Sequence, residues 1–179
     1  MKMLLRTILV LFFCASGFWS CHAQSTRDFR AAERRVQSIF ISNFTRYIQW
    51  PEGANQGTFC IGFLGTNHLQ QEVEAMAKTK TVNGRPMRVA QYGQPGEIPE
   101  QCHMLIISPE NSHQLAEVLR RTRGKPMLIV TQKDGLGKAG SLINFISIDG
   151  QPTFEVNVGA LEQNQLRCAQ QLLRQAVLP

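Results

Sequence analysis

Apolar residues recur at three- and four-residue steps between Val36 and Pro51. This spacing places them along one side of a helix, which residues 28–35 would begin. Trp50 and Pro51 end the pattern, because proline lacks an amide hydrogen and disfavours helical geometry in the residue before it. The stripe predicts a core helix packed on a sheet. In a second interpretation, its end from Tyr47 to Trp50 is exposed and contacts a partner protein, since aromatic side chains are common interface anchors.

The middle of the chain alternates short apolar runs with helical patterns. Four runs predict strands, namely Phe59–Leu64, Met87–Tyr92, Met104–Ile107 and Met127–Val130. One helical pattern covers Leu69–Ala77 with Asn67 as its cap, and another begins near Ser108 and ends at Gly124. This alternation is typical of an α/β layer with a parallel sheet.

The last third has a different pattern. Ser141–Ser147 and Pro152–Val158 predict two strands joined across Asp149-Gly150, because Asp-Gly is a favoured hairpin turn. Gly159 then opens a segment whose apolar residues up to Val177 fit one closing helix. The predicted fold is therefore an α/β three-layer sandwich, with a mostly parallel sheet of about six strands. An antiparallel edge hairpin and N- and C-terminal helices complete it.

The first 23 residues have the pattern of an export signal. Lys2 and Arg6 precede a nearly uncharged apolar run, and Cys21-His22-Ala23 places small residues where a signal peptidase cleaves. We expect a signal peptide over residues 1–23 and one domain over residues 24–179. A retained anchor is disfavoured because the apolar run is shorter than the roughly 20 residues of a membrane span. A lipid anchor on Cys21 is a further alternative.

The charge and the cysteine content narrow the class of protein to which this sequence can belong. The formal net charge is +6 and includes Lys2 and Arg6, so the exported domain would be mildly basic and is not expected to bind nucleic acid. Outside the leader the cysteines are Cys60, Cys102 and Cys168. In an oxidising compartment two of the three can pair. We expect a disulfide between Cys60 and Cys102, which lie next to two predicted strands, and a free thiol at Cys168.

No pattern typical of catalysis, a metal site or a cofactor occurs in the sequence. His103, like the other histidines, is isolated, which favours a surface or capping role. The glycine-rich loop Asp134–Ser141 lacks the following helix of a phosphate cradle, so it predicts a structural crossover. Asn43, Arg46 and Asn157 are polar positions among apolar neighbours. They predict either buried hydrogen bonds or contacts with a ligand or partner.

The order of several motifs resembles the YfiR-like family of exported bacterial proteins. The matching segments are Asn43–Pro51, Phe59–Gly65, Val82–Arg85, Cys102–Ser108, Asp134–Gly140, Ile143–Phe145 and Phe154–Asn157. The resemblance implies a periplasmic regulator without enzymatic activity. Such a regulator restrains the sensor domain of an inner-membrane diguanylate cyclase and thereby lowers cyclic-di-GMP synthesis.

The resemblance also implies partners and site residues. An outer-membrane lipoprotein can draw such a repressor away, and members often form homodimers. The family's paired cysteines fall where Cys60 and Cys102 stand, whereas a second pair is missing here. We expect Arg46, Tyr47 and Trp50 to contact the partner. The alternative is a periplasmic module that binds a nucleotide or an amino acid, in which Asn43, Asn157 or the strand ends near Gly65 and Ser108 hold the ligand.

Overall fold

The computed structural model describes residues 29–179 of the chain. The expected signal peptide therefore lies outside the described residues. The compact unit Val36–Pro179 contains the sheet. The first described element is a helix over residues 29–47, in agreement with the apolar periodicity.

The elements after this helix alternate between strands and helices. In chain order they are β1 (Ile48–Gln49), η1 (Glu52–Ala54), β2 (Phe59–Leu64), α2 (Gln70–Thr79), β3 (Thr81–Val82), β4 (Arg85–Tyr92), η2 (Pro95–Glu97), β5 (Met104–Ile107), η3 (Ser112–Gln114), α3 (Leu115–Thr122), β6 (Leu128–Thr131), β7 (Ile143–Ile148), β8 (Gln151–Val156), α4 (Val158–Gln163), β9 (Arg167–Cys168) and α5 (Gln170–Leu173). The η elements are short 3-10 helices. All four expected strands of the middle region are present.

The main sheet has seven strands in the order β3-β4-β2-β5-β6-β7-β8. The five strands from β4 to β7 in this order are mutually parallel, and β3 and β8 pair antiparallel at the two edges. The hairpin β7–β8 turns at Asp149 and Gly150, whose φ angles of 50° and 75° match the expected tight turn. The predicted fold class is confirmed.

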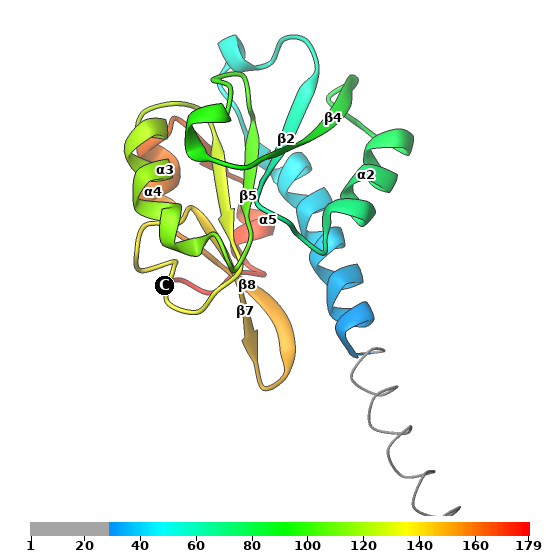
Figure 1. Cartoon of the computed structure of the whole chain (residues 1–179), viewed down its shortest axis with the longest axis vertical. Helices are drawn as coiled ribbons and strands as arrows, with labels where there is room; N and C mark the ends of the chain where they lie inside the picture. The colour runs from blue at the N-terminus through cyan, green and yellow to red at the C-terminus, as the bar shows by residue number, and fades with distance from the viewer. Residues whose placement is uncertain (1–28) are drawn as a thin grey trace, which may run out of the picture. The chain divides into compact units, whose positions relative to one another are not determined.

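Helices cover the sheet on both faces. From β2 the chain passes through α2 to β4 on one side, and from β5 it passes through α3 to β6 on the other. Because such parallel crossovers are right-handed, α2 and α3 lie on opposite faces. Figure 1 shows α2 and the helix of residues 36–47 to one side of the sheet and α3 and α4 to the other.

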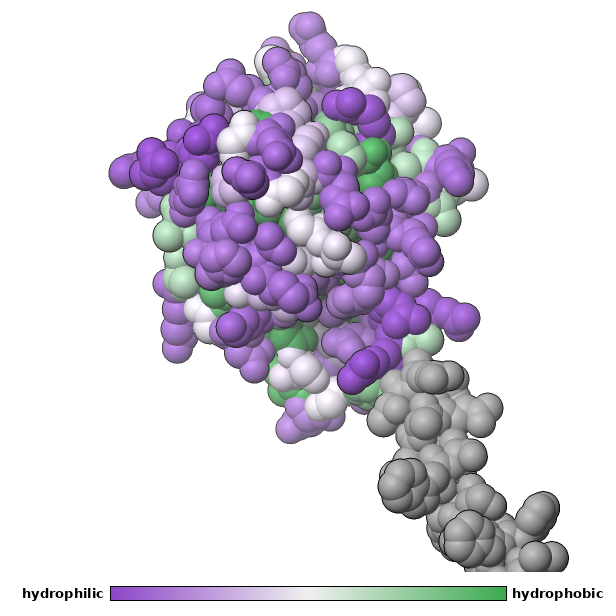
Figure 2. Space-filling model, viewed as in Figure 1, coloured by the Kyte–Doolittle hydropathy of each residue, from purple (hydrophilic) through white to green (hydrophobic). Residues whose placement is uncertain are grey.

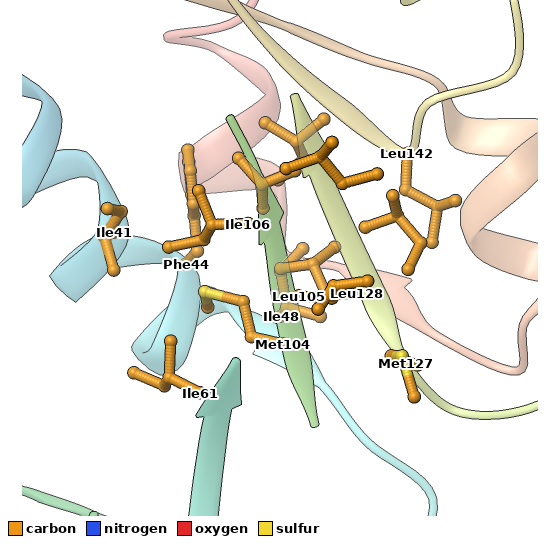
Figure 3. Close-up of a cluster of buried hydrophobic side chains, with 14 of the residues drawn as sticks. Ile41, Phe44, Ile48, Ile61, Met104, Leu105, Ile106, Met127, Leu128 and Leu142 are labelled. Atoms are coloured by element: carbon orange, nitrogen blue, oxygen red, sulfur yellow. The ribbon is translucent and has the colours of Figure 1, made fainter. Parts of the chain in front are cut away.

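The core lies between these layers. Phe44 of the first helix stacks on Phe145 at 5.7 Å between ring centroids and meets Phe154 edge-on at 5.1 Å. In Figure 3, Ile41 and Phe44 face the side chains of β5 across the interior. Burying such side chains stabilises the fold by roughly 1.5–3 kcal/mol each. The face in Figure 2 is correspondingly hydrophilic over most of the described residues.

The prediction of one closing helix was wrong. The segment is divided into α4, β9 and α5, and Gln165 between them has a φ of 59°, which a continuing helix does not allow. β9 pairs antiparallel with β1, with Cys168 opposite Ile48. Cys168 therefore lies in a strand, and the first helix ends at residue 47 because the chain turns into β1.

The two edges of the main sheet differ. The outer edge of β8 is partly covered, because the Val177 amide donates to the Phe154 carbonyl at 3.0 Å and the Val177 carbonyl accepts from the Val156 amide at 2.9 Å. At the other edge, β3 pairs with β4 only. The sequence predicted a turn there, and the structure shows a short hairpin around Asn83 and Gly84.

Candidate functional site

The expected partner-binding residues lie where the first helix ends, but they differ in exposure. Trp50 is buried, with 7% of its surface exposed. Its Nε1–H donates to the His103 carbonyl at 3.2 Å, and its ring meets Phe59 edge-on at 5.0 Å. The prediction of an exposed tryptophan was wrong, because this ring fixes the helix end to β2 and β5. By contrast, Arg46 is exposed and its guanidinium lies 5.4 Å from the centroid of the half-buried Tyr47 ring.

The two expected ligand-binding asparagines lie in different places. Asn43 and Arg46 line the same hollow, of about 470 Å³. Asn157 instead caps α4: its Oδ1 accepts from the Ala160 amide at 3.0 Å, and its Nδ2 donates to the Gly137 carbonyl at 3.3 Å. Asn157 is half-buried, and both of its side-chain hydrogen bonds go to backbone groups.

Cys60 and Cys102 come together as expected, and both thiols are free in the structure. The hydrogen bond from Cys102 lowers the pKa of Cys60 to about 6, assisted by Tyr92 and by the charge of Arg88, whose Nη2 lies 3.7 Å from Cys60 Sγ. The same interaction and burial raise the pKa of Cys102. The pair therefore holds one readily ionised thiol beside a protonated one.

His103 lies beside this pair, and its role was not foreseen from the sequence. It is 6% exposed, so the expected surface role was wrong. Its Nδ1 accepts from the Cys60 amide at 3.1 Å, which assigns the proton of the neutral ring to Nε2; Nε2–H donates to the Ala54 carbonyl at 2.9 Å. Burial lowers the pKa of His103, and the charge of Arg85 lowers it further.

Arg85 completes this cluster. It is 9% exposed, and its Nη1 donates to the Ala54 carbonyl at 3.1 Å and lies 3.3 Å from His103 Nε2. Its guanidinium also lies 5.3 Å from the centroid of the Phe59 ring. Within residues 29–179 no carboxylate forms an ion pair with it, and burial lowers its pKa. Neutral oxygens and an aromatic face stabilise this cation, which orders the loop that follows Trp50.

A second polar network lies under the glycine-rich loop, which leads from β6 into β7 as expected. Thr131 Oγ1 donates to Ser141 Oγ or to Asn144 Oδ1, each at 2.8 Å. Asn144 Nδ2 donates to a carboxylate oxygen of Glu155 at 2.8 Å. Neither Asn144 nor Thr131 is exposed, so hydrogen bonds across β6, β7 and β8 satisfy groups that would otherwise be costly to bury.

A hollow of about 1040 Å³ beside Trp50 was not predicted. Its apolar lining includes Trp50, Leu161, Leu166 and Leu173, and Glu52, Glu162 and Arg167 supply charges. Cys168 also lines it, and burial raises the pKa of this thiol to about 11. This hollow is large enough for a small organic molecule.

The strand ends proposed to hold a ligand are filled from within the chain. β2 and β5 lie where the chain direction across the sheet reverses, which is the usual ligand position in such sheets. Ser108 Oγ donates to Asn111 Oδ1 at 2.9 Å, and Asn111 lies against Gly65 so closely that a Cβ atom there would overlap it. The Asn111 side chain therefore occupies the space between Gly65 and Ser108.

Between residues 29 and 179, no three His, Cys, Asp or Glu side chains gather as metal ligands. None of the helices in that range is long and apolar enough to cross a membrane.

The sheet order and the two helical layers define a doubly wound α/β domain. The model of the YfiR/HmsC-like family matches residues 34–177, which include every element from β1 to α5. The chain therefore belongs to the YfiR/HmsC-like family. No curated protein matches it.

Proposed function

We propose that this protein is a periplasmic regulator that binds the sensor domain of an inner-membrane diguanylate cyclase and restrains cyclic-di-GMP synthesis. The observation that carries the proposal is the family match over residues 34–177. The family consists of periplasmic regulators of diguanylate cyclase signalling. The export signal expected over residues 1–23 is consistent with this location.

The regulation would be non-covalent. A binding protein shifts a two-state receptor only by its difference in affinity for the two states, so this regulator must bind the inactive sensor conformation more tightly. We place Arg46 and Tyr47 in the contact, because Arg46 is exposed and its guanidinium is stacked on Tyr47. Buried Trp50 would support this surface from behind. A homodimer and an outer-membrane lipoprotein that competes for the regulator also form part of the proposal.

The test is direct binding between the purified protein and the periplasmic domain of a diguanylate cyclase encoded beside it. We expect saturable binding by surface plasmon resonance and less cyclic-di-GMP in cells that express both proteins. Arg46→Ala should weaken binding, whereas Arg120→Ala, an exposed arginine on α3, should not. If the protein shows saturable binding to none of these sensor domains, the proposal is excluded.

A second candidate is a periplasmic module that binds a nucleotide or an amino acid. The hollow of about 1040 Å³ favours it, because an apolar lining with a few charged groups is typical of small-molecule sites. A thermal-shift screen of nucleotides and amino acids would distinguish the two functions. A compound that raises the melting temperature of the wild-type protein but not of Leu161→Trp, which fills the hollow, would support the module.

A further inference from the structure

A separate hollow, of about 470 Å³, lies between the first helix and the β3–β4 hairpin. Three segments line it: Ser42, Asn43, Thr45 and Arg46 from the helix; Met76 and Lys80 from α2 and its end; and Thr81, Val82, Asn83 and Met87 from the hairpin. Lys80 Nζ donates to Ser42 Oγ at 3.0 Å, so the end of α2 is tied to the helix at this hollow. We call these residues the β3 hollow.

The charge of the β3 hollow is positive. Arg46 and Lys80 are both exposed, and its lining contains no Asp or Glu. Across residues 29–179 neither cation forms an ion pair with a carboxylate. Ser42, Asn43 and Asn83 add uncharged polar groups around them. The hollow therefore complements a negatively charged occupant.

The β3 hollow also borders an open sheet edge. Asn83 and Gly84 have φ angles of 50° and 77°, so the hairpin has a two-residue type I′ turn closed by the pair Val82 and Arg85. In such a hairpin the next pair, Thr81 with Pro86, directs its backbone groups away from the partner strand. The Thr81 amide and carbonyl thus face outward, and β3 is the last strand on this side.

The floor of the hollow is apolar and adaptable. Met76 and Met87 are half-buried and pack against the core, and Val82 is 3% exposed. Methionine side chains adjust to the shape of an apolar partner group. An extended occupant of the hollow would meet both the cations and the methionines, because Arg46, Lys80, Met76 and Met87 line the same hollow.

We propose that the β3 hollow docks an extended acidic segment of a partner protein, which adds a strand to the outer edge of β3. Carboxylates of this segment pair with Arg46 and Lys80, and its backbone hydrogen-bonds to Thr81. The proposal deepens the proposed function, on which its physiological partner rests, because Arg46 is a residue expected to contact the sensor domain. An anionic lipid surface would satisfy the charges but leave the strand edge unused, so a peptide fits better.

The first experiment is a nuclear magnetic resonance titration of the 15N-labelled protein. The probe is a capped hexapeptide of alternating glutamate and valine. We expect saturable shifts of the amides of residues 42–46 and 80–83, and none with the peptide that has lysine in place of glutamate. Shifts confined to residues around the hollow of Trp50 and Leu161 would overturn the proposal, as would binding to phosphatidylglycerol vesicles without binding to the peptide.

The charge contribution is tested by reversing both cations. Arg46→Glu with Lys80→Glu should weaken peptide binding on the order of tenfold or more, because two attractions become repulsions. The matched control is Arg120→Glu with Arg123→Glu, which changes the net charge equally but lies in a different hollow. If both double variants lose the same affinity, the loss is due to the change in net charge alone, and the assigned site is overturned.

The strand edge is tested at Thr81. Proline there removes the outward N–H, and Lys80 before it already has φ −120° and ψ 159°, a conformation compatible with a following proline. Thr81→Pro should weaken peptide binding severalfold while the melting temperature stays near wild type. Thr81→Val retains the N–H and should bind like wild type. Unchanged affinity in Thr81→Pro would exclude strand addition.

Failure of this inference is distinguishable from failure of the proposed function. If the cyclase sensor domain binds equally well to wild type and to Arg46→Glu/Lys80→Glu, the docking surface is wrong and the function stands. If no sensor domain binds but the acidic peptide still requires Arg46, Lys80 and the Thr81 amide, the surface stands and the function is wrong.

Discussion

The imidazole of His103 accepts a hydrogen bond from the backbone amide of Cys60, with 3.1 Å between the two nitrogens. The bond requires an unprotonated Nδ1 and therefore a neutral ring. Protonation would break it and place a second positive charge beside Arg85, whose Nη1 lies 3.3 Å from the ring. Burial of the ring lowers the pKa of His103, and the charge of Arg85 lowers it further, so both the environment and the hydrogen bond from Cys60 favour the neutral ring.

Acid should destabilise the protein through His103. Because its pKa is lower in the folded state than the usual value of about 6.5, the unfolded chain binds more protons between the two values. The free energy of unfolding should therefore fall as the pH drops below about 6.5. It should rise again when the pH is raised back through this range. Urea unfolding from pH 8 to pH 5 measures this effect.

His103→Asn isolates this contribution. Asparagine can present an acceptor to the Cys60 amide but does not titrate, so the variant should lose about 1–3 kcal/mol at pH 8 and show a weaker pH dependence than wild type. His113→Asn, at an exposed site, should change the stability by less than about 0.5 kcal/mol. If the free energy of unfolding depends on pH in the same way for wild type and His103→Asn, the pH dependence cannot be assigned to His103.

Oxidation should join Cys60 to Cys102. A pKa of about 6 means that Cys60 is largely a thiolate at neutral pH, and Cys102 is its hydrogen-bonding partner. Oxidised glutathione should form this bond in preference to any bond with Cys168, as peptide mapping would show. A disulfide that closes the loop between Cys60 and Cys102 should raise the free energy of unfolding by up to roughly 4 kcal/mol.

Serine variants provide the control for the disulfide. Under oxidising conditions Cys60→Ser should be less stable than wild type, whereas Cys168→Ser, outside the pair, should lose little. Equal stability of Cys60→Ser and the wild type after oxidation would count against the bond. Under reducing conditions the two proteins should differ far less, because the variant then changes only the contacts of the Cys60 sulfur with Cys102, Tyr92 and Arg88.

Local patterns were sufficient for most of the fold. The periodicity from Val36 onward predicted the first helix, and continuous apolar runs such as Met104–Ile107 predicted the buried strands. The Asp149-Gly150 turn was also confirmed, because its backbone preference depends on those two residues alone. In each case the information lies within a few neighbouring residues.

The predictions that were wrong all involve contacts between residues that are distant in sequence. Residues from Leu161 to Val177 carry a helical stripe, yet β9 forms because β1, more than 100 residues earlier, pairs with it. Trp50 is buried against residues distant in sequence, and its N–H donates to the His103 carbonyl, 53 residues later. The polar network of Asn144 and Glu155 could have been suspected from polar residues inside apolar strands, but their pairing depends on the β7–β8 register.

A side chain at position 137 should destabilise the protein. A Cβ atom there would overlap the Glu155 carboxylate and lie 3.0 Å from Cβ of Pro179. Gly137→Ala should therefore displace Glu155 from Asn144 and lower the free energy of unfolding by about 1–3 kcal/mol, measured by urea unfolding. Gly53→Ala is the control, because a Cβ at residue 53 has no atom within 4 Å. Equal stability of the two variants would disprove this account of the loop.

Substitutions of Trp50 should separate its structural role from a direct role in partner binding. Trp50→Phe keeps an aromatic ring against Phe59 but loses the hydrogen bond to the His103 carbonyl, so we expect a loss of about 1 kcal/mol. Trp50→Ala should lose about 3–5 kcal/mol, since it also leaves a cavity. Thermal and urea unfolding would measure both values.

Partner binding by the same variants completes the test. If Trp50 only supports the surface formed by Arg46 and Tyr47, folded Trp50→Phe should bind the sensor domain within about twofold of wild type, because the exposed groups are unchanged. Arg46→Ala should show the reverse, with normal stability and weaker binding, since its side chain is exposed and forms no ion pair among residues 29–179. A large loss of affinity in a stable Trp50→Phe protein would instead place the indole N–H or ring edge in the interface.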